Sequence, residues 1–183
     1  MDKATELYHS FLSGDRDALA EIILMYRDGV TLYINSIVNN ITTAEDLMED
    51  TFVRLCVKKP KFNGKSSFQT WLFSIARHIA IDHLRRQRFR KIPPEDIHDL
   101  ASEENIERSY VQKEEAFHLH AAMNELKPEY RQALYLMYFE NMSGDDIALV
   151  MSLNQRQVRN ILYNARKTLK KILERKGFTY EEL

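Results

Sequence analysis

Apolar residues recur every three or four positions along most of the 183-residue chain, which is the spacing of an amphipathic helix. Between residues 17 and 40 this stripe consists of Leu19, Ile22, Ile23, Tyr26, Val30, Tyr33, Ile34 and Ile37. No segment of useful length alternates apolar and polar residues as a half-buried strand does. The pattern therefore predicts an all-α fold.

Local signals mark where the next two helices begin. Thr43, followed three residues later by Asp46, resembles a capping box at the start of one helix. Ser66 or Ser67 is predicted to cap a longer helix that runs to about Arg90. The inner stripe of this longer helix is Phe68, Trp71, Leu72, Ile75 and Ile79.

The chain divides after Pro93-Pro94, where the sequence becomes acidic and poor in large apolar residues. Such a segment is typical of a linker. We expect two small helical domains, over residues 1–92 and 113–183, joined by an acidic linker over residues 93–112.

The pattern in the second domain is helix, tight turn, helix. Pro128 begins one helix at its first turn, and Ser143, with Asp146 three residues later, caps a short helix. After a turn at residues 152–154, a final helix is expected over about residues 155–176. This order of elements is typical of a helix-turn-helix.

Composition limits the class of protein further. Hydrophobic residues make up 44% of the chain, enough for a folded core, and the scarcity of glycine (5) and proline (4) argues against a sandwich or barrel. The single cysteine, Cys56, excludes an intramolecular disulfide framework. No apolar run approaches the roughly 18 residues that span a bilayer, and the polar N-terminus lacks a signal-peptide core. We therefore expect a cytoplasmic protein with no membrane insertion.

The formal net charge of −1 hides a strong segregation of charge along the chain. Residues 61–92 carry 8 basic residues and 1 acidic residue, and residues 151–176 again carry 8 and 1. The intervening residues 93–150 carry 4 basic and 13 acidic residues. Two basic segments separated by acidic sequence suggest two contacts with a polyanion, although charge runs are also typical of solvated helix faces.

The second basic segment is the final predicted helix. Beside its apolar stripe it carries a polar face that includes Arg156, Gln157, Arg159, Asn160, Tyr163, Asn164, Arg166 and Lys167. Arginine pairs with guanine, asparagine and glutamine pair with adenine, and lysine neutralises phosphate. We interpret the face as one that binds DNA in the major groove. The alternative is a basic amphipathic helix packed in an ordinary bundle.

The first basic segment combines cations with aromatic residues. Its cations are Arg77, Arg85, Arg86, Arg88, Arg90 and Lys91. Basic and aromatic side chains together suit single-stranded or distorted DNA, because bases stack on rings while arginine follows the phosphates. The spacing of Phe68 and Trp71 indicates core positions, whereas Phe62, in a loop beside Gly64, is expected to expose its ring.

Three stretches of the chain carry a family resemblance. Residues 44–55 form the acidic segment AEDLMEDTFVRL, and Phe62-Asn63-Gly64 is followed by SFQTWLFSIAR at residues 67–77. The third stretch is discontinuous and lies in the helix-turn-helix, at residues 130–134, 142–148, 158–160 and 165–169. In this order and spacing they resemble the extracytoplasmic-function (ECF) sigma factors, the promoter-specificity subunits of bacterial RNA polymerase.

The resemblance implies a function, partners and site residues. It implies a chain that binds core RNA polymerase and promoter DNA, assists promoter melting, is open to inhibition by an anti-sigma factor, and needs no cofactor or metal. Polymerase binding is implied for Asp46, Glu49, Asp50 and Arg54. Binding of minus-ten DNA is implied for Phe62, Asn63, Lys65, Arg77, His78, Arg85 and Arg86. Binding of the minus-thirty-five element is implied for Arg156, Gln157, Arg159, Asn160, Tyr163, Asn164, Arg166 and Lys167.

The chain departs from the family pattern at several positions. His78 stands where the family usually has asparagine in the wall of the flipped-base pocket, and histidine offers different hydrogen bonds. Ser152 replaces the usual glycine of the turn, and Gln155-Arg156-Gln157 replaces a Gly-Thr start of the recognition helix. Ile161 and Asn164 stand where arginine is common. The resemblance therefore does not carry the promoter consensus over to this chain.

Other interpretations remain open from the sequence. A stand-alone helix-turn-helix transcription regulator would explain the C-terminal half but would leave residues 44–55 and the first basic segment unused. An interaction protein, such as a decoy for an anti-sigma factor, would use the helical faces without binding DNA. An enzyme is the least favoured, because no phosphate loop, nucleophile elbow or His-Glu metal motif occurs. His118 and His120 are two residues apart, so they would point to different faces of a helix rather than share a metal.

Overall fold

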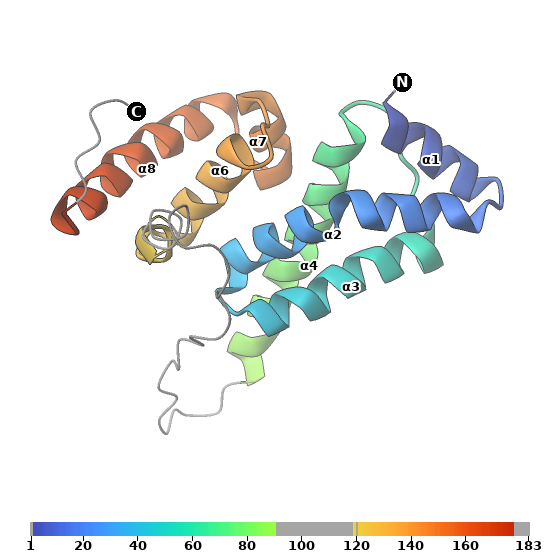
Figure 1. Ribbon diagram of the computed structural model, residues 1–183, viewed down its shortest axis with the longest axis horizontal. Coiled ribbons are helices and arrows are strands. Elements are labelled where there is room, and N and C mark those ends of the chain that lie inside the picture. Colours follow the sequence, from blue (N-terminus) through green and yellow to red (C-terminus); the bar gives the residue numbers. More distant parts are fainter. Residues whose placement is uncertain (1, 91–118, 120, 178–183) are drawn as a thin grey trace.

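The computed structural model describes residues 2–90, 119 and 121–177, and their regular secondary structure is entirely helical, which confirms the all-α prediction. The linker predicted over residues 93–112 lies outside these ranges. In the N-terminal half the helices are α1 (Lys3–Leu12), α2 (Arg16–Val38), α3 (Ile41–Lys58) and α4 (Phe68–Arg90). In the C-terminal half they are α6 (Pro128–Tyr138), α7 (Gly144–Met151) and α8 (Gln155–Arg175), as Figure 1 shows.

The N-terminal half is a bundle in which α2, α3 and α4 pack against one another and α1 packs on α2 and α4. α1 has no counterpart among the predicted helices. It has only 10 residues, so its apolar stripe repeats too few times to stand out. Its start is fixed by Asp2, whose carboxylate accepts a hydrogen bond from the Thr5 N–H at 2.7 Å.

The helix starts follow the predicted caps at two positions and differ at one. The hydroxyls of Ser67 and Ser143 each accept a backbone N–H from the following turn, as predicted. Thr43 does not cap α3, so that prediction is wrong. The helix begins at Ile41, and Asn40 is its N-cap, with Oδ1 accepting from the Thr43 N–H at 2.9 Å. Asparagine is at least as good an N-cap as threonine, so the helix begins earlier.

An aromatic cluster fills the core where α1 meets the beginning of α4. The Tyr8 ring centroid lies 5.4 Å from that of Phe68 and 5.3 Å from that of Trp71. Phe62 packs on the same two rings and is only 9% exposed, so the prediction that it exposes its ring is wrong. The Tyr8 hydroxyl donates to the Pro60 carbonyl at 2.7 Å, which ties the loop to the core, and burial of a ring among other rings is favourable.

The two halves pack directly against each other, which the sequence analysis did not predict. α6 lies against α2, and α7 lies against α4 (Figure 1). Two polar residues of α6 are buried there. The Nε of Arg131, which is 6% exposed, donates to the Ser36 carbonyl at 2.6 Å. Gln132, which is 3% exposed, accepts from Arg77 Nε at 3.3 Å. Buried polar groups of this kind require matched partners, so the contact is a specific one.

Candidate nucleic-acid and polymerase interfaces

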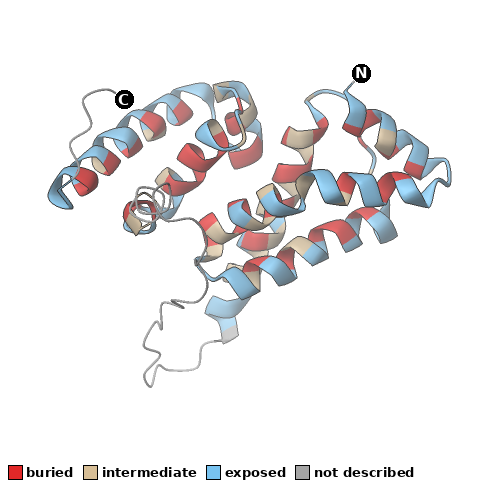
Figure 2. Ribbon diagram, viewed as in Figure 1, coloured by how far each residue is buried: buried red, intermediate tan, exposed pale blue. Residues whose placement is uncertain are grey.

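α8 has one buried face and one exposed face. Val158, Leu162, Ala165 and Leu169 are buried where α8 packs on α6 and α7, and the other side of the helix is exposed along its length (Figure 2). The exposed residues include all those predicted to bind the minus-thirty-five element: Arg156, Gln157, Arg159, Asn160, Tyr163, Asn164, Arg166 and Lys167. A basic, exposed helix face is suited to a major groove.

The first turn of α8 is fixed by a capping box. Asn154 Oδ1 accepts from the Gln157 N–H at 2.9 Å, and Gln157 Oε1 accepts from the Asn154 N–H at 2.9 Å. Gln157, predicted only as a DNA-binding residue, therefore also sets where the helix begins. The sequence analysis missed this role, although an N-cap residue three positions before glutamine is its signature.

The turn between α7 and α8 requires a left-handed residue. Ser152 caps α7 with φ 56° and ψ 46°, a conformation that glycine adopts without strain. For a residue with a Cβ it costs on the order of 1 kcal/mol. A glycine at position 152 would adopt this conformation without that cost.

Arg166 is held by α6 rather than extended into solvent. Its Nε donates to the Tyr138 hydroxyl at 2.8 Å, and its guanidinium carbon lies 5.7 Å from the centroid of the Tyr138 ring. Cation and ring contacts of this kind are favourable at exposed sites. Arg166 would have to leave Tyr138, or bring it along, to reach a nucleic acid.

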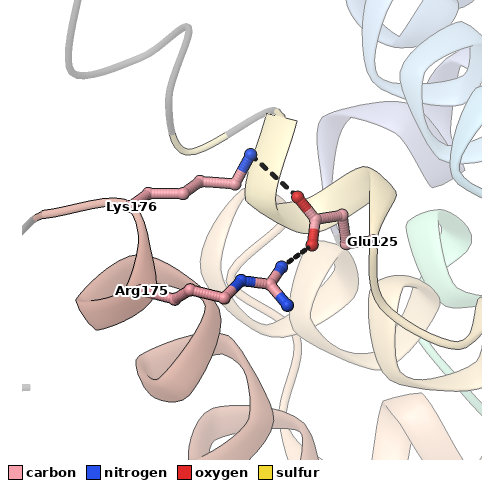
Figure 3. Close-up of polar contacts among 3 residues, drawn as sticks. All are labelled: Glu125, Arg175 and Lys176. Carbon is pink, nitrogen blue, oxygen red and sulfur yellow. Dashed lines mark hydrogen bonds and ion pairs between the residues drawn. The ribbon is translucent and has the colours of Figure 1, made fainter.

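The far end of α8 is fastened by an ion-pair cluster (Figure 3). The Glu125 carboxylate contacts Lys176 Nζ at 2.8 Å and also pairs with the Arg175 guanidinium. The hydrogen bond from Lys176 and the two nearby positive charges lower the pKa of Glu125 from its usual 4.5. The cluster joins the end of α8 to the residues just before α6, so both ends of α8 are anchored.

The residues predicted to bind minus-ten DNA differ in their exposure and in the contacts they make. Asn63 and Lys65 are exposed in the loop before α4, where Asn63 Oδ1 accepts from the Lys65 N–H at 3.1 Å. His78 is exposed on α4, with Nδ1 2.6 Å from the Ser74 carbonyl. Arg77 is partly buried against α6.

Arg85 and Arg86 lie near the C-terminal end of α4. Arg85 pairs with Asp82 at 3.1 Å. Arg86 lines an open groove of about 630 Å³ between α3 and α4, together with Asp50 and Arg54 of α3. The structure thus places Arg86, predicted to bind DNA, beside two residues predicted to bind polymerase. The other two predicted polymerase residues, Asp46 and Glu49, are exposed on α3.

Two apolar residues of this groove were missed by the sequence analysis. Val53 and Val57 are 56% and 67% exposed on α3, and both line the groove. Their spacing of four residues, outside the buried stripe of α3, was the available signal. An apolar strip edged by charged residues is typical of a protein–protein contact.

Within residues 2–90, 119 and 121–177, no group of histidine, cysteine and carboxylate side chains could hold a metal ion. None of the helices in those ranges is long and apolar enough to cross a membrane.

Two family models match the chain. The model of sigma-70 region 2 matches residues 22–90, and that of sigma-70 region 4 matches residues 117–169. The chain is 30% identical to the RNA polymerase sigma-H factor of Pseudomonas aeruginosa over 172 residues, which cover 88% of this chain and 89% of that protein. It is 27% identical to the ECF sigma factor SigM of Bacillus subtilis over 155 residues, covering 85% and 94%.

Solved structures share the fold at lower identity. CnrH in complex with the cytosolic domain of CnrY matches with a TM-score of 0.69 and 21% identity, covering 94% of this chain and 98% of that one. The sigma factor RpoE of Bartonella quintana, in complex with the anti-sigma factor NepR, matches with a TM-score of 0.63 and 22% identity, covering 85% and 96%.

The chain therefore belongs to the ECF group of the sigma-70 family of RNA polymerase sigma factors. It is a non-enzymatic transcription initiation factor that binds core RNA polymerase and promoter DNA. Membership of this family accounts for both halves of the chain, whereas a stand-alone regulator would explain only the C-terminal half.

Proposed function

We propose that three exposed surfaces of this sigma factor divide promoter recognition among them. In this proposal α8 binds the minus-thirty-five element, the loop before α4 and part of α4 bind the minus-ten element and help melt it, and the groove between α3 and α4 binds core polymerase. The two DNA-binding surfaces belong to domains at residues 1–92 and 113–183, joined by residues 93–112.

The observation that carries the proposal is the exposed basic face of α8. Arg159 and Asn160 lie in its second turn, immediately after a tight turn and a capped helix start. In a helix-turn-helix the early residues of the second helix meet the base edges. Arg156, Lys167 and the later lysines would then neutralise phosphates, which sets affinity rather than sequence preference.

For the minus-ten element we propose Asn63, Lys65 and His78 as the DNA-contacting residues, since all three are exposed. Phe62 is left out, because its ring is buried in the aromatic cluster and has no free face on which a base could stack. Arg77 would contribute only after leaving Gln132, which it contacts, and Arg86 lies on the groove between α3 and α4.

For polymerase binding we propose the groove residues Asp50, Arg54, Val53 and Val57, with Asp46 and Glu49 beside them. The charged residues would orient the encounter, and the two valines would supply the apolar area that stabilises the complex.

We also propose an anti-sigma factor as a partner of this chain, because RpoE, which shares its fold, was solved with the anti-sigma factor NepR. Binding to RNA polymerase would place the chain in the cytoplasm.

The proposal is tested by transcription in vitro with purified core polymerase, this protein and a library of genomic fragments. Start sites that depend on the protein should share two spaced upstream elements. His78→Ala should change preference at the nearer element and Asn164→Ala at the farther one, whereas His9→Ala, an exposed histidine on α1, should change neither. If His78→Ala and Asn164→Ala leave both elements unchanged, the assignment of the DNA-binding surfaces is wrong.

A further inference from the structure

A side-chain hydrogen bond joins the first turn of α7 to the first turn of α8. Gln155 Nε2 donates to Asp145 Oδ1 at 2.6 Å, across a separation of ten residues in the chain. Gln155 is the first residue of α8, and Asp145 is the second residue of α7. The bond therefore fixes a polar side chain at the start of the helix whose early residues would meet the base edges.

The carboxylate also fixes which way the Gln155 amide faces. An ionised carboxylate only accepts hydrogen bonds, so the amide nitrogen is the atom that points to Asp145. The amide oxygen is then turned away from Asp145, and one of the two amide hydrogens is used. Gln155 itself is exposed, which leaves room for a ligand at its oxygen and its second hydrogen.

The other glutamine of this turn is used differently. Gln157 Oε1 accepts from the Asn154 N–H at 2.9 Å, as part of the capping box. A paired contact to adenine needs both the oxygen and a hydrogen of one amide, because adenine offers N6 as donor and N7 as acceptor in the major groove. The oxygen of Gln157 is already engaged by the backbone. Of the two glutamines, Gln155 is thus the one that keeps both groups.

Gln155 lies on the side of α8 that carries Arg159, which is proposed to meet a base edge. It lines an open groove of about 440 Å³ together with Arg159, Tyr163 and Arg166. At 100° per residue, Gln155 and Arg159 are roughly 40° apart around the helix. Asp145 lines the same groove. A negative charge there repels phosphates, so the carboxylate contributes by the amide that it holds and not by attraction to DNA.

We propose that Gln155 is a specificity-determining residue of this sigma factor, which selects an A·T base pair in the minus-thirty-five element, and that Asp145 is its positioning residue. Oε1 of Gln155 accepts from adenine N6, one amide hydrogen is donated to adenine N7, and Asp145 holds the other hydrogen. The inference rests on the proposed binding of the minus-thirty-five element by α8. It gives a base-reading role to a residue that the sequence analysis did not place among the DNA contacts.

The test is transcription in vitro with core polymerase and the full chain, on promoters that carry every possible base pair at each position of the farther element. The wild type should prefer A·T at one position, and Gln155→Ala should reduce that preference about 5- to 150-fold. Asp145→Ala should reduce it at the same position, but by less, because the amide remains and only its orientation is released. Glu174→Ala, which removes a negative charge from an exposed position near the far end of α8, is the control and should leave the preference unchanged.

Exchanging the donor and the acceptor gives a second readout. In the double variant Asp145→Asn with Gln155→Glu, the amide stands on α7 and the carboxylate on α8, so a hydrogen bond between them can still form. The carboxylate accepts from cytosine N4 and cannot donate to adenine N7. The base preferred at that one position should therefore change from adenine to cytosine on the same strand.

Thermal unfolding of each variant separates base reading from a structural fastening of α7 to α8. If Gln155→Ala lowers stability and leaves every base preference unchanged, the proposal is wrong. A double variant that still prefers adenine would overturn it as well. If Arg159→Ala changes selection at the farther element and Gln155→Ala does not, the proposed function stands and only this inference fails. If base changes in the farther element do not affect even the wild type, the proposed role of α8 is wrong and this inference falls with it.

Discussion

α4 and α8 are both long basic helices, yet their polar faces differ in exposure. The polar residues of α8 are exposed along its length, whereas Gln69, Thr70 and Arg77 of α4 are hydrogen-bonded to the C-terminal half. The two basic segments that contain these helices, residues 61–92 and 151–176, have the same balance of basic and acidic residues in the sequence. The comparison teaches that charge identifies a surface that can bind DNA but not whether it is accessible.

The width of the apolar face accounts for the difference. At 100° per residue, the buried positions of α8 from Val158 to Leu173 span an arc of about 100°. The buried apolar positions of α4 span about 140°, since Phe73 and Ala80 are buried along with Phe68, Leu72 and Ala76. A wider apolar arc needs neighbours on more sides. α4 therefore packs on α1, α2, α3 and α7, whereas α8 packs on α6 and α7.

The largest expected effect on stability comes from a substitution in the core of the C-terminal half. Ile147 is 0% exposed on α7, the helix that contacts both α4 and α8. Ile147→Ala should lower the free energy of unfolding by about 2–5 kcal/mol, because it removes buried methyl groups and leaves a cavity. Urea denaturation measures the loss. Leu149→Ala, 57% exposed on the same helix, is the control and should change stability by less than about 0.5 kcal/mol.

The proposed DNA-binding face of α8 is tested next by Arg159→Ala. If Arg159 makes the proposed bidentate contact to a base, the change should cost about 1–3 kcal/mol in recognition of the minus-thirty-five element. The measurement is start-site selection by the reconstituted polymerase on promoters with a mutated farther element. Arg16→Ala, an exposed arginine at the start of α2, should leave selection unchanged. Equal effects of both changes would indicate that Arg159 contributes only nonspecific positive charge and does not recognise a base.

The N-terminal half can be weakened without touching α8 by removing the cap of α3. Asn40→Ala should lower the free energy of unfolding by about 0.5–2 kcal/mol, because the Thr43 N–H loses its side-chain acceptor. Thr43→Ala should have a much smaller effect, since its side chain makes no capping hydrogen bond. Thermal unfolding of the two variants distinguishes these caps, and a larger loss for Thr43→Ala would contradict the observed start of α3.

The smallest expected effect concerns the end of α8. Because the pKa of Glu125 is lowered in the folded protein, its ion pairs stabilise the fold above the unfolded pKa near 4.5, and this contribution is lost as pH falls through the folded pKa. Glu125→Gln should therefore be less stable than the wild type at pH 7, and the difference should shrink as pH falls through the folded pKa of Glu125. Denaturation midpoints measured over a series of falling pH values test this, and a difference that does not shrink would exclude the ion pairs as its cause.

Much of the secondary structure was predictable because its signals are local. The stripes of α2, α4 and α8, the caps Ser67 and Ser143, and the proline that begins α6 all depend on residues within one or two turns. The predictions that were wrong concern positions where two local arrangements compete. Asn40 and Thr43 both offer capping oxygens, and only the folded helix shows which is used. Phe62 could face water or the core, and its packing on Phe68 and Trp71 places it in the core.

The sequence by itself determined the family and the helical class, and it predicted candidate residues for binding DNA or polymerase, because these depend on residue type and short spacing. Only the tertiary structure decided which of those residues are accessible. Residue type alone would lead one to expect Arg77 and Arg131 to be exposed. In the structure Arg77 is partly buried where α4 meets α6, and Arg131 is buried where α2 meets α6. The partners that bury them lie 55 and 95 residues away in the chain, and local patterns carry no information about contacts at that separation.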